Sequence, residues 1–427
     1  MTIQDFYNTI FLANTTISTD SRNITPNCLF FALSGETFNG NTFALQALEQ
    51  GAAYAIVDDK SLQSHNRCIV VENALQFLQQ LATYHRKQCK AKILAITGTN
   101  GKTTTKELIS AVLSQKFTII NTLGNLNNHI GVPLTLLRIT GETEIAVIEM
   151  GANHEKEIEF LCAIAQPDYA IITNVGKAHL EGFGSFETII RTKTEMYDFI
   201  KAHDGTIFQD FDNEILRANN KNITNCISYA FNADAEYRGE IVRNSIFAAF
   251  NFKHHNTETL IQSQLFGEYN AKNMLAAATI GSYFGVSNEQ IKQAIEEYSP
   301  TNNRSQLTKT AHNTLILDAY NANPTSMRAA IEEFGKVHYE AKTLILGEMF
   351  ELGNDAEKEH TTIIKLIDSF QFQSVFLVGN WHSATRYNHF ATAQELKNYL
   401  VENPLKDNCV LIKGSRGVKL ETVVEDL

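Results

Sequence analysis

The stretch Ala95-Ile-Thr-Gly-Thr-Asn-Gly-Lys-Thr-Thr-Thr-Lys106 decides the fold of the central part of this chain. It continues the apolar run 92–97, which predicts a buried strand, and it leads into a helical pattern over 102–115. Glycines between a strand and a helix allow successive backbone N–H groups to surround phosphate oxygens. A following lysine reaches the outer phosphates and a following threonine suits Mg²⁺. This order predicts a nucleotide-binding loop.

The loop departs from the general pattern G-x-x-x-x-G-K-[ST], because Ile96 stands where the first glycine would be. An alternative interpretation is an ordinary strand–turn–helix in which the glycines serve the turn alone. We favour phosphate binding, because the strand, the Gly101-Lys102-Thr103 triplet and the helix all agree. Binding a nucleotide does not yet name a reaction.

Strand-like runs repeat on both sides of this loop and predict an α/β protein of three domains. The 427 residues suit two to four domains at about 100–200 residues each. We expect a small N-terminal α/β domain (1–88), a central P-loop ATPase-type domain with a mostly parallel sheet (89–298), and a C-terminal Rossmann-like doubly wound domain (299–427). The runs that predict strands are 28–33, 53–57, 68–71, 92–97, 145–149, 169–174, 314–318, 343–347, 375–379 and 409–412, and 240–266 suggests a β-hairpin.

Charge and composition limit the kinds of partner. Lys and Arg number 36 against 47 Asp and Glu, a net charge of −11, which argues against a broad nucleic-acid surface. Apolar runs stay well short of the roughly 18 residues that a membrane span needs. The first twenty residues lack the basic start of a signal peptide, and the six cysteines form no Cys-x-x-Cys pair. We therefore expect a cytoplasmic protein.

Three further side chains are candidates for chemistry beside the loop. Glu149 ends the apolar run 145–149, where a carboxylate opens onto the ligand crevice of an α/β sheet and suits Mg²⁺. A solvated strand end is the alternative. His179 follows the run 169–174 and could equally be a loop or core histidine. Lys193 has the sequence context of a solvated helix lysine.

Taken together, these segments resemble the Mur ligase family of ATP-dependent amide-forming enzymes. The resemblance rests on Thr97-Gly-Thr-Asn-Gly-Lys-Thr-Thr104, on Glu149-Met-Gly, and on the loop around His179. The missing first glycine is normal in that family, so Ile96 supports the resemblance. Within the family, the chain resembles the branch that adds a dipeptide more closely than the others. The segments that carry this closer resemblance are Thr19-Asp-Ser-Arg22, Leu29-Phe-Phe-Ala-Leu-Ser-Gly-Glu36, Asn125-Leu-Asn-Asn128, Glu149-Met-Gly-Ala-Asn153, Asp318-Ala-Tyr-Asn-Ala-Asn-Pro324, Leu346-Gly-Glu-Met-Phe-Glu-Leu-Gly353 and Lys413-Gly-Ser-Arg416.

The resemblance implies a function and a set of small-molecule partners. We expect an ATP- and Mg²⁺-dependent ligase that forms an amide through an acyl phosphate. Its substrates would be UDP-N-acetylmuramoyl-tripeptide and D-alanyl-D-alanine, and its product a pentapeptide precursor of peptidoglycan. A monomer is expected. The residue at the third position of the peptide, diaminopimelate or lysine, stays open.

The same resemblance implies a role for individual residues. The phosphates would be held by Gly98, Thr99, Asn100, Gly101, Lys102, Thr103 and Thr104. Mg²⁺ would lie among Thr103, Glu149 and His179, with Lys193 as a further ligand if it is carbamylated. Asn270 and Asn273 match residues on the adenine side, and Arg304 and Asp318 match residues that close over the γ-phosphate and the ribose. The expected catalytic residues are Lys102, Lys193, His179 and Arg304, and the expected substrate-binding residues are Ser21, Arg22, Asn128, Asn153, Asn321 and Asn323.

Other functions share part of this pattern. A folylpolyglutamate synthase-like ligase shares the loop and the chemistry, but the N-terminal Asp20-Ser-Arg22 segment is not expected in it. Another Mur ligase would take a single amino acid, against which the Tyr320-Asn-Ala-Asn-Pro324 segment argues. A third alternative is a nucleotide-gated binding protein without ligase activity, which the phosphate loop alone supports.

Overall fold

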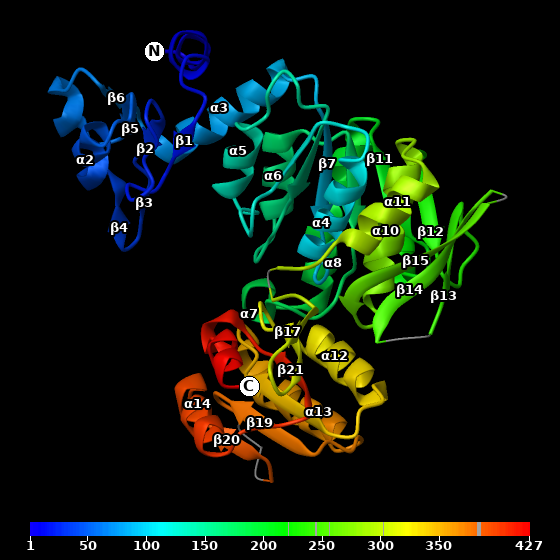
Figure 1. The fold of residues 1–427 in the computed structure, drawn as a ribbon. Coiled ribbons are helices and arrows are strands. Elements are labelled where there is room, and N and C mark those ends of the chain that lie inside the picture. The colour runs from blue at the N-terminus through cyan, green and yellow to red at the C-terminus, as the bar shows by residue number, and fades with distance from the viewer. Residues whose placement is uncertain (221, 244–245, 256, 302, 382–385) are drawn as a thin grey trace.

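The structure is a computed structural model that describes the chain except for residues 221, 244–245, 256, 302 and 382–385. The described residues form three main sheets, which follow one another along the chain (Figure 1). Helices alternate with strands in each of them. The expected α/β class with three units is confirmed. Within the described part of the chain, no helix is long and apolar enough to cross a membrane.

The N-terminal unit is a small parallel sheet with strand order β1-β2-β5-β6. Its apolar residues alternate between faces, as the two-residue period of a strand requires. Phe30 packs with residues of α2, whereas Leu29 and Phe31 face a cluster that includes Leu78 of α3. The elements are α1 (Ile3–Phe6), β1 (Ile17–Ser18), β2 (Leu29–Phe31), β3 (Ser34–Gly35), β4 (Phe38–Asn39), α2 (Ala44–Glu49), β5 (Tyr54–Val57), β6 (Cys68–Val70) and α3 (Ala74–Gln88).

The central sheet has the order β15-β14-β13-β12-β11-β10-β7-β9-β8, so β7 and its loop lie between β10 and β9. Ile93 of β7 faces one layer of helices and Leu94 faces the other, because successive side chains point to opposite faces. Its strands are β7 (Lys92–Thr97), β8 (Ile119–Asn121), β9 (Ile145–Glu149), β10 (Tyr169–Ile172), β11 (Thr206–Asp210), β12 (Cys226–Ala230), β13 (Tyr237–Ile241), β14 (Phe247–His254) and β15 (Thr257–Phe266).

Helices cover both faces of this sheet. One layer is formed by α4, α10 and α11, and the other by α5, α6 and α8. The predicted hairpin is confirmed, since β14 and β15 are antiparallel neighbours, and β13 extends the antiparallel edge. The helices are α4 (Lys102–Leu113), α5 (Gly131–Leu136), α6 (Glu157–Ala165), α7 (Leu180–Phe183), α8 (Phe186–Ala202), α9 (Glu214–Ala218), α10 (Asn270–Tyr283) and α11 (Asn288–Glu297).

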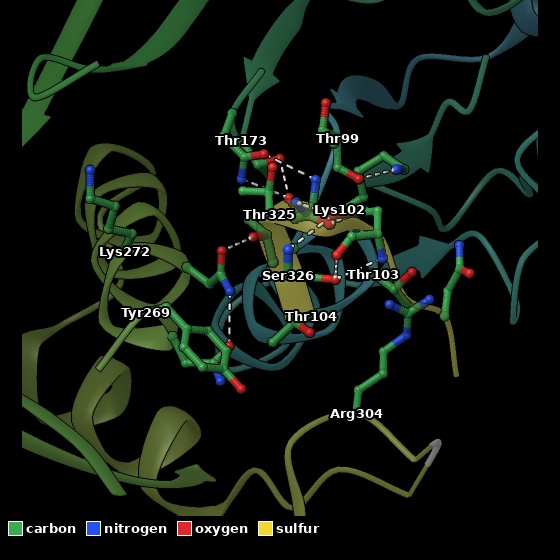
Figure 2. A pocket seen from close by; sticks show the side chains of 18 of the residues that line it. Thr99, Lys102, Thr103, Thr104, Thr173, Tyr269, Lys272, Arg304, Thr325 and Ser326 are labelled. Atoms are coloured by element: carbon green, nitrogen blue, oxygen red, sulfur yellow. Dashed lines mark hydrogen bonds between the residues drawn. The ribbon is translucent and has the colours of Figure 1, made fainter. Parts of the chain in front are cut away.

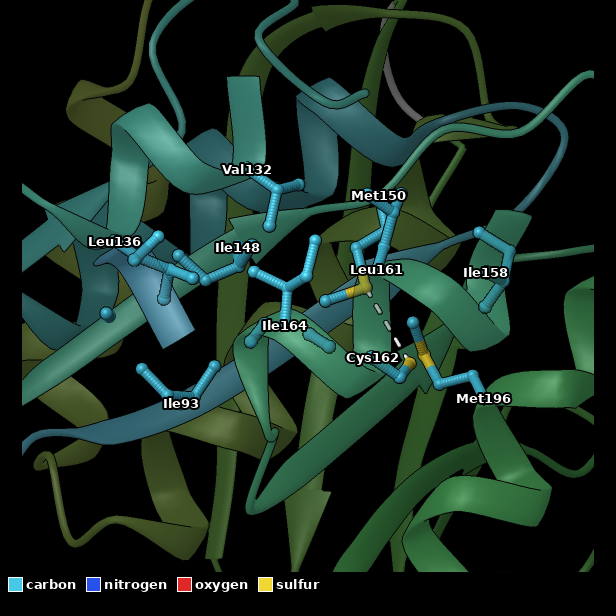
Figure 3. Packing of buried hydrophobic residues seen from close by; sticks show 14 of the residues in the cluster. Ile93, Val132, Leu136, Ile148, Met150, Ile158, Leu161, Cys162, Ile164 and Met196 are labelled. Carbon is cyan, nitrogen blue, oxygen red and sulfur yellow. Dashed lines mark hydrogen bonds between the residues drawn. The ribbon is translucent and has the colours of Figure 1, made fainter. Parts of the chain in front are cut away.

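Helix α3 joins the first two units through one buried cluster. Its Leu78 and Leu81 are fully buried and belong to the same cluster as Leu136 of α5 and Leu161 of α6. Figure 3 shows the central side of this cluster, where residues of α5 and α6 pack over Ile93 and the neighbouring strand. The N-terminal sheet and the central sheet therefore share a core.

The C-terminal unit is a doubly wound sheet with the order β16-β17-β21-β18-β19-β20. Helices α12 and α13 cover one face, and α14 with the last turn of chain covers the other. The final strand, β21, inserts between β17 and β18, which places Lys413 beside Asp318. The elements are β16 (Gln306–Lys309), β17 (Thr314–Asp318), α12 (Pro324–Lys336), β18 (Lys342–Gly347), α13 (Ala356–Ile367), β19 (Ser374–Val378), β20 (Asn388–Phe390), α14 (Ala393–Glu402) and β21 (Cys409–Lys413).

Candidate active site

A cavity of about 970 Å³ lies between the central and C-terminal units, and both units line it. It opens at the carboxyl ends of the central strands, where ligands bind in open α/β sheets. Most of the predicted site residues meet here. They are Thr99, Asn100, Gly101, Lys102, Thr103, Thr104, Asn128, Glu149, Asn153, His179, Asn270, Asn273, Arg304, Asp318, Asn321 and Asn323.

The loop between β7 and α4 has a backbone that only glycine suits at two positions. Gly98 has φ of 143° and Gly101 has φ of 77°, both outside the ordinary range for L-residues. A Cβ atom on Gly98 would lie 2.1 Å from Thr173 Oγ1, and one on Gly101 would lie 2.6 Å from Asn273 Oδ1. The glycines therefore allow close packing as well as the turn, and α4 begins directly at the loop without a side-chain cap.

The end of β10 holds the loop in place. Asn174 O accepts a hydrogen bond from Thr99 N at 2.9 Å, and Asn174 Oδ1 accepts one from Asn100 N at 3.0 Å. The Thr173 hydroxyl donates to Asn100 O at 2.7 Å. These contacts hold the loop against the residues that follow the neighbouring strand.

Lys102 and Arg304 project into the same cavity from the central unit and from the linker that follows it (Figure 2). The ammonium of Lys102 donates to Gly98 O at 2.8 Å and to Thr99 O at 3.1 Å. Burial lowers the pKa of Lys102; Glu149 opposes this shift and the charge of Arg304 adds to it. Lys102 and Arg304 therefore lie close enough to influence each other beside the loop, where two cationic side chains suit a polyphosphate.

Glu149 provides an oxygen that fits a bound cation. The residue is 1% exposed, and its Oε1 accepts from Asn127 Nδ2 at 2.8 Å and from the Thr103 hydroxyl at 3.3 Å. Its other oxygen, Oε2, is buried and has no hydrogen-bond partner among the described residues. A lone carboxylate oxygen beside a threonine hydroxyl suits Mg²⁺, which keeps several waters and takes few protein ligands. Consistent with that sparse set, no three His, Cys, Asp or Glu side chains of the described chain converge on one metal position.

His179 lines the cavity, but its ring is already engaged across the domain boundary. It has a left-handed backbone with φ of 51°, and its Nδ1 forms an ion pair with Glu351 of the C-terminal unit. The hydrogen bond from His179 lowers the pKa of Glu351, although burial opposes the shift. In this arrangement His179 links the two units, and its predicted place beside Mg²⁺ stays a prediction.

Lys193 is buried in α8, contrary to its sequence context as a solvated helix lysine. It is 3% exposed, its ammonium lies 3.4 Å from Ala152 O, and it stands 5.5 Å from the centre of the Phe183 ring. Burial, with the charge of Lys102, lowers the pKa of Lys193 to about 7. A neutral amine is therefore available near neutral pH.

The two asparagines expected on the adenine side belong to one hydrogen-bond chain at the start of α10. Asn273 Nδ2 donates to Asn270 Oδ1 at 2.9 Å, and the hydroxyl of Thr105 donates to Asn273 Oδ1 at 3.1 Å. Asn270 Nδ2 in turn donates to Phe266 O at 2.8 Å and to Ser305 Oγ at 3.0 Å. The chain of bonds runs from the phosphate helix α4 to the linker.

The C-terminal side of the cavity is built on a buried ion pair. Lys413 Nζ lies 2.6 Å from Asp318 Oδ2 and also donates to Asn321 O at 3.4 Å. Asp318 Oδ1 accepts from the backbone of Ser305 at 3.2 Å. The pair joins the carboxyl ends of β17 and β21, where the topology brings those strands together.

Four predicted residues lie outside the cavity wall that the described residues form: Ser21, Arg22, Gly98 and Lys193. Arg22 belongs to the N-terminal unit, its side chain is 87% exposed, and its guanidinium pairs with Asp20 at 2.8 Å. Asn128, which does line the cavity, also accepts from Gly131 N at 2.9 Å at the start of α5. The role of each remains a prediction.

The structure adds residues that the sequence did not single out. They are Asn127, Tyr269, Lys272, Ser305, Tyr320 and Lys413, all on the cavity wall. Asn127, Tyr320 and Lys413 stand inside motifs quoted above, so proximity to those motifs was the available signal. Their side-chain contacts depend on the folded arrangement of two units.

Family models of the Mur ligases match three successive parts of the chain. The model described as "Mur ligase family, catalytic domain" matches residues 14–86, "Mur ligase middle domain" matches residues 96–281, and "Mur ligase, glutamate ligase domain" matches residues 303–416. The three models together cover most of the chain.

Individual relatives align over nearly the full length. The chain is 35% identical to a UDP-N-acetylmuramoyl-tripeptide--D-alanyl-D-alanine ligase of Bacillus subtilis, covering 96% of this chain and 92% of that one. A crystal structure of MurF from Acinetobacter baumannii superposes with a TM-score of 0.87 at 32% identity, over 96% and 93% of the two chains. MurF of Thermotoga maritima in complex with ADP gives a TM-score of 0.86 at 25% identity, covering 97% of each.

Proposed function

Because this chain belongs to the Mur ligase family, we propose that it joins D-alanyl-D-alanine to UDP-N-acetylmuramoyl-tripeptide. The reaction consumes ATP and releases ADP and phosphate. The relatives at 34–35% identity that carry this activity in their names support the assignment. The observation that carries it is the phosphate loop beside a Glu149 oxygen that has no hydrogen-bond partner among the described residues, in a cavity that the C-terminal unit also lines.

The chemistry runs in two balanced steps. A carboxylate oxygen of the peptide attacks the γ-phosphorus of ATP, the bond to the β-bridging oxygen breaks, and an acyl phosphate and ADP result. The dipeptide amine then attacks the acyl carbon, loses a proton, and expels phosphate as the amide forms. The carboxylate is a poor electrophile until it is phosphorylated, which explains why ATP is needed.

Positioning and electrostatics are the chain's contribution to the first step. The backbone N–H groups at the start of α4 would face the phosphates, and Lys102 and Arg304 would offset charge on the transferred group. Thr103 and Glu149, with His179, would hold Mg²⁺, which supplies further charge compensation at the phosphate oxygens. A carbamylated Lys193 would add an anionic oxygen ligand.

Substrate positions follow from the walls of the cavity. Asn270 and Asn273 would face the adenine, with Asp318 near the ribose. Asn128 and Asn153 lie on the central wall, where the peptide would enter, and Asn321 and Asn323 lie on the C-terminal wall. Ser21 and Arg22 would contact the uridine nucleotide from the N-terminal unit. Enclosing the reaction between two units excludes water, which would hydrolyse an acyl phosphate.

We also propose domain boundaries at 88/89 and 298/299 and a cytoplasmic location. Each strand pair among the described residues joins two strands on the same side of these boundaries. The six cysteines are free thiols, as is usual in a reducing compartment.

The test is phosphate release with ATP, Mg²⁺, UDP-N-acetylmuramoyl-tripeptide and D-alanyl-D-alanine, leaving out one component at a time. We expect release to need both peptide partners and the product mass to increase by the dipeptide. Release with a pterin substrate instead would favour a folylpolyglutamate synthase-like ligase. ATP hydrolysis indifferent to both partners would favour a nucleotide-gated binding protein.

A further inference from the structure

Arg304 stands in an unusual stretch of backbone. The residues on either side of it, Asn303 and Ser305, have left-handed φ angles of 55° and 50°. Such conformations are sparsely populated by non-glycine residues and persist where surrounding contacts impose them. At functional sites this kind of backbone often presets the direction of one side chain.

Contacts from both units impose this backbone. Ser305 is buried, and its hydroxyl lies 3.0 Å from both Asn270 Nδ2 and Tyr269 OH of the central unit. Its backbone N–H donates to Asp318 Oδ1 of the C-terminal unit at 3.2 Å. The linker is therefore fixed at the residue that follows Arg304.

The guanidinium of Arg304 is held in a different way. Its Cζ lies 3.8 Å from the centre of the Tyr320 ring, well within the range of a cation–π contact. Its Nε is buried and has no hydrogen-bond partner among the described residues. Arg416 lies over the same ring at the longer distance of 5.5 Å.

A ring beneath a guanidinium fixes its plane without using its donors. The five N–H groups of an arginine point outward in that plane, whereas the ring contacts only its face. A carboxylate partner would instead occupy two of those donors and offset the charge. The Tyr320 ring therefore suits an arginine whose donors must remain available for phosphate oxygens.

We propose that Tyr320 is a positioning residue for the reaction, acting through Arg304 alone. Its ring holds the guanidinium on the phosphate side of the cavity, and Ser305 holds the backbone from which Arg304 extends. This role rests on the proposed function, in which Arg304 offsets charge on the transferred phosphoryl group. Both Tyr320 and Arg304 line the cavity that contains Lys102.

The test combines Tyr320→Leu, Tyr320→Phe and Arg304→Ala with the double variant Tyr320→Leu/Arg304→Ala. We expect Tyr320→Leu to lower kcat about tenfold with little change in the KM for ATP, since the contact orients a group that acts during transfer. Tyr320→Phe keeps the ring and should stay within about twofold of the unaltered protein. In the Arg304→Ala background, Tyr320→Leu should change nothing further.

Each other result overturns the proposal. Additive losses in the double variant would mean that Tyr320 acts independently of Arg304. A Tyr320→Phe defect equal to that of Tyr320→Leu would assign the effect to the hydroxyl. A Tyr320→Leu loss that disappears in an Arg416→Ala background, but persists with Arg304→Ala, would assign it to Arg416. Thermal unfolding of each variant shows whether it is folded, and failure of the unaltered protein to ligate would overturn the proposed function instead.

Discussion

Asn100 of the phosphate loop and Asn323 at the start of α12 bond to each other through their side-chain amides. Asn323 Nδ2 donates to Asn100 Oδ1 at 2.7 Å. The oxygen of Asn323 also accepts from Ser326 N at 2.9 Å, and so caps the helix. One side chain thus connects the C-terminal unit to the loop and completes a helix end.

The substitution Asn323→Asp separates these two roles. An aspartate still caps α12, so the free energy of unfolding should change by less than about 0.5 kcal/mol. It cannot donate to Asn100, and it places a negative charge near the phosphates, so the KM for ATP should rise about tenfold. Steady-state kinetics at several ATP concentrations measures this. Asn398→Asp, the same change on an exposed face of α14, is the matched control. An equal KM in both variants would contradict the prediction.

Removing the charge of Glu149 should weaken the response to Mg²⁺. In Glu149→Gln the amide oxygen can still accept from Asn127, so the local fold is retained. The buried oxygen that fits a cation is lost, and we expect the Mg²⁺ concentration for half-maximal rate to rise at least about tenfold. Titration of phosphate release with Mg²⁺ gives this value. Glu142→Gln, an exposed acid, serves as the control, and an unchanged Mg²⁺ curve for Glu149→Gln would refute the role.

The low pKa of Lys193, about 7, predicts a pH-dependent modification. Only a neutral amine combines with CO₂ to form a carbamate. As pH falls below 7 the amine becomes protonated, so carbamylation should be lost toward pH 6 and should increase toward pH 8. With ¹³C-labelled bicarbonate, the carbamate signal should follow this course and be absent from Lys193→Ala. A signal that is equal at pH 6 and pH 8 would count against the prediction.

The core shared by the first two units predicts that shortening one of its buried side chains strongly lowers the free energy of unfolding. Leu136 of α5 is fully buried in the cluster that joins the first two units. Leu136→Ala removes three carbon atoms from this cluster and should lower the free energy of unfolding by about 2–5 kcal/mol. Urea-induced unfolding measures the loss. Val401→Ala, at a side chain that is 64% exposed, should change it by less than about 0.5 kcal/mol. Equal effects would show that the cluster is not tightly packed.

Sequence patterns located the elements that are apolar throughout. The predicted strands 92–97 and 145–149 match β7 and β9, because a parallel strand covered on both faces is a continuous apolar run. Strands β11 and β12 were missed, since they mix polar and apolar residues. Gln209 of β11 is buried, and its side chain donates to Leu216 O at 2.8 Å and accepts from Cys226 Sγ at 3.4 Å, partners that the pattern does not reveal.

The residues of the candidate site also differ in how far the sequence could predict them. The phosphate loop was predictable because its residues are consecutive and their order carries the chemistry. The pairing of His179 with Glu351, and of Arg304 with Tyr320, depends on how two units meet. Lys193 shows the limit most clearly, since its sequence context predicted a solvated helix lysine and the packing of α8 buries it.

The packing of helix α3 affects which parts of the protein unfold together. Its Leu78 and Leu81 pack in one cluster with residues of both the N-terminal and central sheets, so the faces of the two sheets that border this cluster share their packing. The C-terminal core instead includes Phe266 and the half-buried Ile246 from the central unit. Regions that share buried apolar contacts open together, whereas regions joined by fewer open separately. We therefore expect residues 1–298 to behave as one cooperative block in hydrogen exchange, and the C-terminal unit as a second.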